Sequence, residues 1–304
     1  MLQTAAPISA PWNARNRLAL TTPDGSGATI HPSVVDMGTS WNGYRYWMAN
    51  TPYAAADNQL ENPAIWASNN RLGWVVPAGV ANPLVAPPGA SVGFHSDTEL
   101  VWDPDDSRLL MFFRTAWFTG TPVVVTSIEL RATTSTDGTT WSAPVKVADL
   151  PLTGGRLSPA VVRTGANQWR MWLWGGDLTG TTRTASNPLG TWGAPASLTL
   201  NGADLLGWHG DVIRVGSTYY MAYSANELDQ MKVATSANGI AWTAPAVPTV
   251  VTRSTTRWDR SVYRPTLCNG PESGFISVWY SAVSAPSPGG HAIGFTRIPI
   301  SAWT

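Results

Sequence analysis

Five short apolar strands of this sequence each begin with a polar or ionisable residue. Two positions further along, on the same face of each strand, a second polar set includes Glu99 and Asp211. A charge that enters an apolar core must be paired or functional, because burying it alone is costly. The mixture of acids, imidazoles and a guanidinium favours a functional site over a hydrogen-bonded polar plug. The five first residues are His31, Asp97, Ser158, His209 and Arg264, and the second set is Ser33, Glu99, Ala160, Asp211 and Thr266.

These strands open five copies of one phrase: HPSVV, DTELVW, SPAVV, HGDVI and RPTLC, each followed by a second strand rich in bulky apolar residues. Repetition at a period of 51 to 66 residues is typical of a propeller, whose innermost strands line a central channel. We therefore expect an all-β fold, a single five-bladed β-propeller with four-stranded antiparallel blades starting near residues 31, 97, 158, 209 and 264. The runs MFF, MWLW and YYMAY predict second strands that are covered on both faces.

Composition excludes several classes of partner. Of 304 residues, 12% are charged, and 19 Lys and Arg balance 19 Asp and Glu without a basic run. Nucleic acid and anionic membranes both require clustered positive charge, so neither is expected as a partner. The single cysteine, Cys268, lies in an apolar strand, and we expect a buried, inert thiol.

Residues 1–17 lack both a basic start and a long apolar run, so they predict neither a secretory signal nor a membrane span. We interpret them as an N-terminal arm, with the propeller over residues 18–304. The segment RLAL or its neighbours is expected to complete the last blade, because ring closure removes exposed strand edges. A protein without a signal can still leave a cell by lysis, as virion components do.

The segment Ser135–Trp141 (STDGTTW) fits the Asp-box pattern S-x-D-G-x-T-W found in sialidase-like propellers. Its Asp can bond the hairpin backbone, its Gly can adopt positive φ, and its Trp can pack between strands. Looser versions occur at 68–74, 186–192 and 236–242. These turns support the fold and carry little information on function.

The chain resembles the five-bladed glycosidases of the arabinanase, xylosidase and fructosidase group. The phrases HPSVV with WNGYRYWMANTPY, ENP, SDTELVW, WHGDVI and YRPT more closely resemble propeller modules of phage tail-associated proteins, over about residues 29–300. The resemblance implies a virion-borne or extracellular domain that binds a cell-surface polysaccharide. Its arm would contact other virion proteins.

The glycosidase pattern is incomplete. In that group the first inner strand carries an Asp base and the third a Glu acid, whereas His31 and Ser158 stand here, and only Asp97 fits. Glycoside hydrolysis needs one protonated and one ionised carboxyl group. If the chain is a hydrolase, the candidate catalytic residues are therefore Asp97 with Glu61 or Asp211. Glu227 is a weaker candidate.

Sugar binding requires aromatic faces beside hydrogen-bonding groups. A cation held near His31, His95 or His209 is a further alternative, although calcium prefers oxygen ligands. No other cofactor is indicated, because P-loop, CxxC and HExxH motifs are all missing. The candidate substrate-binding residues are His31, His209, Arg264, Tyr263, Tyr53, Asn62, Trp208, Trp117 and Trp174.

Two functions remain open at this point. One is a glycoside hydrolase that acts on a cell-surface or cell-wall polysaccharide. The other is a non-catalytic virion module that binds glycan or neighbouring subunits through a degenerate site. Fold alone does not separate them.

Overall fold

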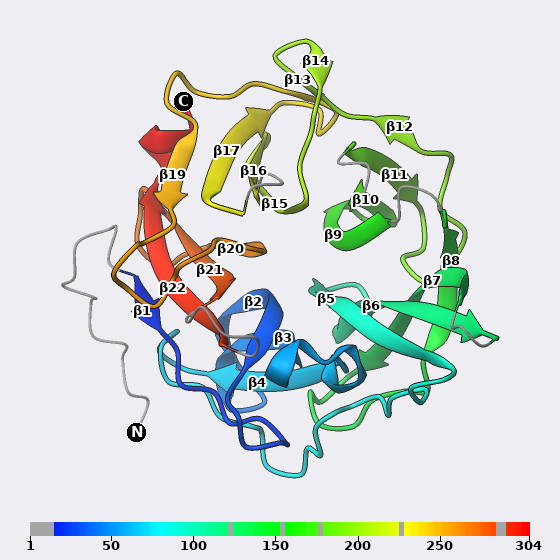
Figure 1. Ribbon diagram of the computed structural model, residues 1–304. Helices are drawn as coiled ribbons and strands as arrows, with labels where there is room; N and C mark the ends of the chain where they lie inside the picture. Colours follow the sequence, from blue (N-terminus) through cyan, green and yellow to red (C-terminus); the bar gives the residue numbers. More distant parts are fainter. Residues whose placement is uncertain (1–14, 121–123, 153–155, 176–178, 225–227, 284–289) are drawn as a thin grey trace.

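The computed structural model describes residues 15–120, 124–152, 156–175, 179–224, 228–283 and 290–304. Within these residues the regular structure is β-strand, apart from the short 3-10 helices η1 (Ala54–Ala56), η2 (Asn58–Leu60) and η3 (Ile300–Trp303). The sheets surround a central axis (Figure 1), which confirms the expected all-β single propeller. No helix of the described part has the length and apolar character needed to cross a bilayer.

The described strands form six sheets. The first sheet contains β2 (Thr29–Trp41), β3 (Tyr44–Pro52) and β4 (Ala64–Ser68), and the second contains β5 (Gly93–Asp103), β6 (Arg108–Thr119), β7 (Val124–Ser135) and β8 (Val145–Leu150). The third sheet contains β9 (Arg156–Gly165), β10 (Gln168–Gly175), β11 (Thr181–Ala185) and β12 (Ala196–Ser197), and the fourth contains β15 (His209–Val215), β16 (Thr218–Ser224), β17 (Gln230–Ser236) and β19 (Thr249–Thr252). The fifth sheet contains β20 (Pro265–Asn269), β21 (Phe275–Val283), β22 (His291–Pro299) and β1 (Asn16–Arg17), and the sixth contains β14 (Ala203–Asp204), β13 (Thr199–Leu200) and β18 (Ala241–Trp242).

Five blades of four strands each was therefore a wrong expectation. Counted by sheets, the described residues give six blades, and only four of the sheets have four strands. The sixth sheet lies at the outer rim, near the top of Figure 1. Its strands have two residues each, which is too short to produce an alternating pattern that sequence reasoning could detect. In the first sheet, the chain after β4 adds only the isolated bridge Ala67–Val75 where a fourth strand was expected.

The strands β2, β5, β9, β15 and β20 lie nearest the axis, and each contacts the next around a closed ring (Figure 1). The ring is completed by the N-terminal segment, because β1 pairs antiparallel with β22 of the fifth sheet. The expected closing strand is thus present; it begins one residue before RLAL and includes the first residue of that segment, so that Asn16 and Arg17 belong to the propeller body. Residues 1–14 of the predicted arm lie outside the described part.

Consecutive apolar residues of the second strands pack on opposite sides, as expected. In β3, Tyr46 and Met48 join a core cluster shared with β20–β22, whereas Trp47 joins a cluster shared with β5 and β6. The strand β10 divides Met171 and Trp172 between its two neighbouring sheets in the same way. Each fully buried side chain of this size contributes about 1.5–3 kcal/mol to stability. The core is therefore a set of contacts between sheets, and it holds the inner strands in register.

The Asp-box turn has the geometry that its sequence indicates. Asp137 Oδ1 accepts hydrogen bonds from the backbone N–H groups of Thr139 (2.7 Å) and Thr140 (2.6 Å). Gly138 has φ +76°, and Trp141 donates its indole N–H to the Gly138 carbonyl at 3.3 Å. The turn connects β7 to β8, the outer strands of their sheet, far from the axis.

Candidate functional site

Two inner strands are irregular at their first polar residue. The pairing of β2 with β3 shifts between Ile30 and Ser33, and that of β5 with β6 shifts between Ser96 and Glu99. His31 and Asp97 stand within these bulges with φ of 55° and 54°. Left-handed backbone at a non-glycine residue costs about 1–3 kcal/mol and occurs preferentially at functional sites. The bulges place both side chains in the wall of one pocket at the start of the inner strands.

The His31 imidazole lies between two carboxyl groups. Its Nδ1 is 2.7 Å from Glu61 Oε1, and its Nε2 is 3.5 Å from Asp97 Oδ1. Glu61 directly follows η2, whose start is capped by Asp57 through a 2.8 Å bond to the Gln59 N–H. This capped turn folds the first-sheet insertion over the pocket and delivers Glu61 to it.

A second imidazole approaches Asp97 from β15. The nitrogen Nδ1 of His209 is 3.6 Å from Asp97 Oδ1 and is hydrogen-bonded to the Ser158 hydroxyl. Ser158 also donates to Asp97 Oδ1 at 2.6 Å. The four first-position residues His31, Asp97, Ser158 and His209 are thus brought together as the aligned phrases predicted.

The rest of the pocket wall combines a guanidinium with aromatic rings. Arg114 Nε donates to Ser96 Oγ at 2.8 Å and lies 3.4 Å from Asp97 Oδ2, while its guanidinium stacks over Phe94. Trp208 donates its indole N–H to the Tyr263 hydroxyl at 3.1 Å. The cavity has a volume of about 160 Å³, which suits one sugar residue. It is lined by Ile30, His31, Tyr53, Asn58, Glu61, Phe94, Asp97, Arg114, Trp208, His209 and Tyr263.

Burial and charge separate the protonation states of these groups. Burial raises the pKa of Glu61 above its usual range. Burial acts in the same direction on Asp97, but neighbouring charges, to which His31 and Arg114 contribute most, outweigh it and hold the pKa of Asp97 well below its usual range. Burial also lowers the pKa of His209 far below that of a free imidazole. At neutral pH the pocket therefore contains an ionised Asp97 and a neutral His209.

Among the described residues, His31, Asp97 and His209 form a donor set suited to a metal ion. Their ligand atoms lie within 4.8 Å of one another, and all three side chains are buried. The Nε2 atoms of both imidazoles have no hydrogen-bond partner. Two imidazoles with one carboxylate fit a first-row transition ion or zinc better than calcium, which prefers oxygen. His95 lies apart from this set, because it bonds Thr115 at 2.9 Å and the Ala86 carbonyl at 3.2 Å.

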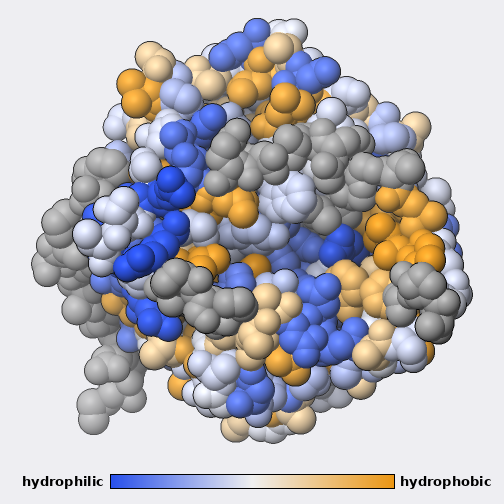
Figure 2. Space-filling view, viewed as in Figure 1, coloured by the Kyte–Doolittle hydropathy of each residue, from blue (hydrophilic) through white to orange (hydrophobic). Residues whose placement is uncertain are grey.

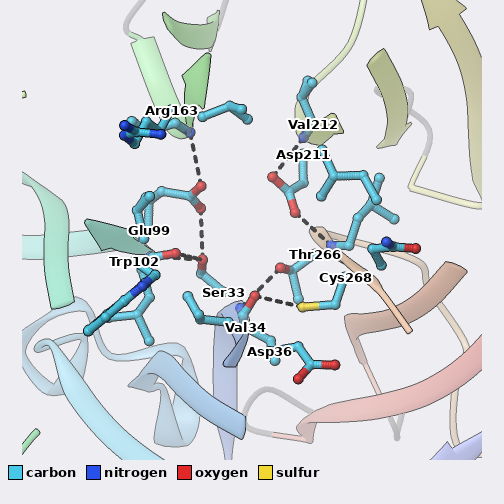
Figure 3. A pocket seen from close by; sticks show the side chains of 18 of the residues that line it. Ser33, Val34, Asp36, Glu99, Trp102, Arg163, Asp211, Val212, Thr266 and Cys268 are labelled. Carbon is cyan, nitrogen blue, oxygen red and sulfur yellow. Dashed lines mark hydrogen bonds between the residues drawn. The ribbon is translucent and has the colours of Figure 1, made fainter. Parts of the chain in front are cut away.

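Two charged residues expected at this mouth lie elsewhere. Asp211 accepts from the backbone N–H groups of Leu267 (2.6 Å) and Val212 (2.7 Å), and it lines a different cavity together with Glu99. Arg264 reaches Glu99 Oε2 at 3.1 Å and the Pro159 carbonyl at 3.0 Å. Figure 3 shows the Glu99 and Asp211 carboxylates bonded to neighbouring strands. Asp211 stands two residues after His209, and a shift of two residues along an extended strand covers about 6.6 Å, which is enough to separate two layers of side chains. Arg264 stands at the first position, but its long side chain extends to Glu99 of the second layer.

Three further expectations do not match the pocket. Trp174 is fully buried in the core between the third and fourth sheets, against Gly210. Trp117 of β6 is paired with Gly93 of β5 and is not part of the pocket lining. Asn62 turns away and donates to the Gln59 carbonyl at 2.8 Å. Glu227 lies outside the described residues.

Sequence reasoning missed Arg114 as a lining residue, together with Ile30, Asn58 and Phe94. Arg114 did carry a signal, because it is the only charged residue between Leu109 and Trp117 of an apolar second strand. The face drawn in Figure 2 is hollowed near its middle, and hydrophilic residues lie in and beside the hollow.

Comparison with known proteins supports the propeller fold. No family model matches the chain. Over 115 residues the chain is 34% identical to the A type blood N-acetyl-α-D-galactosamine deacetylase of Flavonifractor plautii. The matched segment covers 38% of this chain and 14% of that relative. The chain therefore spans a small part of the curated relative that it matches.

Solved structures extend the likeness over nearly the whole chain. An N-acetylgalactosamine deacetylase from F. plautii, in complex with blood group B trisaccharide, superposes with a TM-score of 0.81 at 21% identity, covering 94% of this chain and 95% of that one. A family-43 β-xylosidase/α-arabinofuranosidase from a compost metagenome superposes with a TM-score of 0.66 at 12% identity, covering 95% of each chain. At these identities the likeness concerns the fold, which is that of the propellers on which the glycosidase resemblance was based.

Proposed function

We propose that this chain is a carbohydrate-active enzyme that removes the acetyl group from an N-acetylated amino sugar, with a divalent metal ion held by His31, Asp97 and His209. The observation that carries the proposal is the convergence of these three buried donors, with two unpartnered imidazole nitrogens, at one pocket of single-sugar size. The partial sequence match to an N-acetylgalactosamine deacetylase supports the choice of reaction.

The reaction is amide hydrolysis. The oxygen of water forms a bond to the acetyl carbon, the bond from that carbon to nitrogen breaks, and acetate and the free amine leave. A bound divalent ion would supply Lewis-acid polarisation of the carbonyl group. The protein residues must then remove a proton from water and deliver one to the departing nitrogen.

Glu61 is placed for both proton transfers. Its buried carboxyl group lines the pocket and has a raised pKa, so its carboxylate is a stronger base than an exposed one. Once protonated, the same group can donate to the amine. The contact with His31 Nδ1 holds one carboxyl oxygen in place at 2.7 Å.

The Tyr263 hydroxyl is placed to bind the substrate carbonyl. It already accepts the Trp208 indole N–H, so its own proton is available to another acceptor in the pocket. Asp97 stays ionised throughout, since its pKa is held low, and Arg114 fixes its second oxygen. Phe94 and Ile30 offer apolar surface for the acetyl methyl group.

Acetate release tests this proposal. The purified chain is incubated with glycosides of N-acetylgalactosamine and N-acetylglucosamine in the presence of Zn²⁺, Mn²⁺ or Co²⁺, and acetate is measured. We expect release by the wild type, loss of release with a chelator, and background rates for Asp97→Asn and Glu61→Gln. His95→Gln is the matched control, because it alters a buried imidazole outside the pocket. Failure of the wild type to release acetate across this panel contradicts the proposal.

Glycoside hydrolysis is the second candidate. It is favoured by the opposite pKa shifts of Glu61 and Asp97 in one pocket, as required of an acid and a base. The His31 ring between the two carboxyl groups leaves less room for a glycosidic bond between them. Reducing-sugar release measured in the same incubations distinguishes the two reactions.

A non-catalytic glycan-binding module would retain sugar and release neither acetate nor reducing sugar. The virion or extracellular setting, the phage-tail association and the contacts of the arm with other virion proteins stay predictions.

A further inference from the structure

Ser158 bonds two residues that line the pocket, but it is not itself part of the lining. It belongs to β9, is fully buried, and is hydrogen-bonded to both Asp97 and His209. Its hydroxyl donates to Asp97 Oδ1 at 2.6 Å, and it is also hydrogen-bonded to His209 Nδ1.

The number of hydrogens in this contact determines the direction of both bonds. A serine hydroxyl has one proton and two acceptor lone pairs, and an ionised carboxylate can only accept. The proton of Ser158 is therefore given to Asp97, and the hydroxyl oxygen must accept from His209. This requires that Nδ1 of His209 carries the hydrogen.

A neutral imidazole that is protonated on Nδ1 has its lone pair on Nε2. In His209 this Nε2 atom is buried and has no hydrogen-bond partner, while the residue itself lines the pocket. The ring is held by Tyr263, whose centroid is 4.3 Å away, and by Trp208 at 5.8 Å. Metal-binding imidazoles almost always donate their other N–H to a fixed acceptor, which sets both tautomer and orientation.

We infer that Ser158 is a positioning residue that holds His209 in the Nδ1–H tautomer and thereby presents its Nε2 lone pair to the pocket. The inference rests on the proposed function for the use of that lone pair, but the tautomer itself is a property of the metal-free protein. Its counterpart at His31 is Glu61, whose carboxyl group contacts Nδ1 at 2.7 Å. The two imidazoles are thus oriented by chemically different partners.

The experiment compares the wild type with Ser158→Ala, Ser158→Thr and a matched control. Ser224→Ala is the control, because Ser224 is equally buried and its hydroxyl contacts the backbone carbonyl of His209 at 3.4 Å, not the ring. Long-range ¹H–¹⁵N correlation spectra of the chelator-treated protein give the His209 tautomer. Calorimetric titration with Zn²⁺ alone gives the metal affinity.

We expect the wild type, Ser158→Thr and Ser224→Ala to show the Nδ1–H tautomer. In Ser158→Ala we expect a tautomer mixture and a Zn²⁺ affinity lower by roughly 10- to 100-fold, the usual effect of losing such a partner. An unchanged tautomer together with an affinity within about twofold of the wild type overturns the inference. If Ser158→Ala does not fold, Ser158→Cys, which fills the same space with a weak hydrogen-bonding group, is measured in the same way.

Failure of the proposed function has a different signature. A wild type that releases no acetate would contradict the deacetylase reaction and leave the tautomer measurement intact. A wild type that releases acetate, combined with an unaltered tautomer in Ser158→Ala, would overturn only the role of Ser158.

Discussion

His31 and Asp97 adopt backbone conformations that most residues avoid, and both line the pocket. Aligning the repeated phrases was sufficient to predict that these two residues would meet Ser158 and His209, because each stands at the same point of an inner strand. The alignment could not predict the bulges, since nothing in HPSVV or SDTELV distinguishes a bulged strand from a regular one. The strain at both residues supports a functional reading of the site.

The same alignment failed for Asp211. An aspartate carboxyl group can extend toward a ligand or accept hydrogen bonds from backbone N–H groups. The residue type is the same in both cases, so the sequence does not distinguish them. Asp211 does the second. For Trp174, the bulk that suggested a sugar platform instead fills the space beside Gly210 in the core.

His95 should make stability depend on pH. Burial lowers its pKa to about 4, from a usual value of 6.5. The unfolded chain therefore binds a proton that the folded chain does not, so the free energy of unfolding is greatest above pH 6.5 and falls as the pH drops toward 4. The loss due to His95 is about 3 kcal/mol at most.

Urea unfolding at pH 7 and pH 4.5 measures this effect. His95→Gln should show a smaller decrease in unfolding free energy between the two pH values than the wild type. Equal decreases in the two proteins would contradict the role assigned to His95.

At the scale of strands, side chains of the second polar layer join four of the five pairs of neighbouring inner strands. Ser33 accepts from the Leu100 N–H (2.8 Å), Glu99 from Val161 (3.0 Å), Asp211 from Leu267 (2.6 Å) and Thr266 from Val34 (3.1 Å). The fifth member is Ala160, which has no acceptor, and the Val212 N–H bonds to Asp211 Oδ1 instead. Figure 3 shows several of these bonds around the cavity. The polar-plug alternative considered from the sequence thus describes this layer.

Asp211→Ala should leave two buried N–H groups unpaired and lower the free energy of unfolding by roughly 2–5 kcal/mol. Adding Ala160→Ser to this variant supplies an acceptor near Val212 and should recover about 1 kcal/mol. Denaturant unfolding of the single and double variants measures both effects. A loss below about 1 kcal/mol in Asp211→Ala would contradict the bonding described.

The Asp-box turn permits a test of packing between sheets. A Cβ atom on Gly138 would lie 2.2 Å from the Trp47 ring, whereas one on Gly25 would meet nothing within 4 Å. Both glycines have similar positive φ, +76° and +75°. Gly25→Ala should therefore show the backbone cost alone, about 1–2 kcal/mol, and Gly138→Ala should lose clearly more.

Thermal or urea unfolding of both glycine variants gives the comparison. Acetate release should be unchanged in Gly25→Ala, because Gly25 is not among the residues that line the pocket. Equal losses of stability in the two variants would show that Trp47 moves aside freely.

For the whole molecule, the sequence predicted an all-β propeller closed by its N-terminal segment, and both features are present. The repeated phrases reveal the strands near the axis because burial on both faces imposes an apolar pattern on them. They do not reveal the sixth sheet or the incomplete first sheet, whose outer segments are short and face solvent on one side. Outer strands obey weaker constraints, so their number is the least predictable part of the fold.

Ring closure depends on a buried ion pair. Arg15, next to β1, donates to Asp259 Oδ2 at 2.8 Å, and Asp259 is fully buried. Arg257 and Arg260 are close to Asp259 in the sequence, but the cation that pairs with it comes from the other end of the chain. Arg15→Ala should lower the free energy of unfolding by about 3 kcal/mol, because it leaves a buried carboxylate without its cation.

Loss of β1 should also expose the edge of β22 and promote self-association. Denaturant unfolding and size-exclusion chromatography of Arg15→Ala measure the two effects. Arg17→Ala is the control, since Arg17 is exposed on the same strand. Identical behaviour of the two variants would contradict the role of the ion pair.

The bonds between second-layer side chains and neighbouring inner strands also bear on how the chain folds. Four of the five inner strands receive from a neighbour an acceptor that they do not supply themselves, and only the Val212 N–H of β15 is bonded within its own strand. A fragment holding two or three sheets would therefore bury polar groups with nothing to bond. Partly folded states therefore have a high free energy until the last sheet closes the ring. Folding should then behave as one cooperative transition over most of the chain, without the sheet-by-sheet growth that open repeat arrays allow.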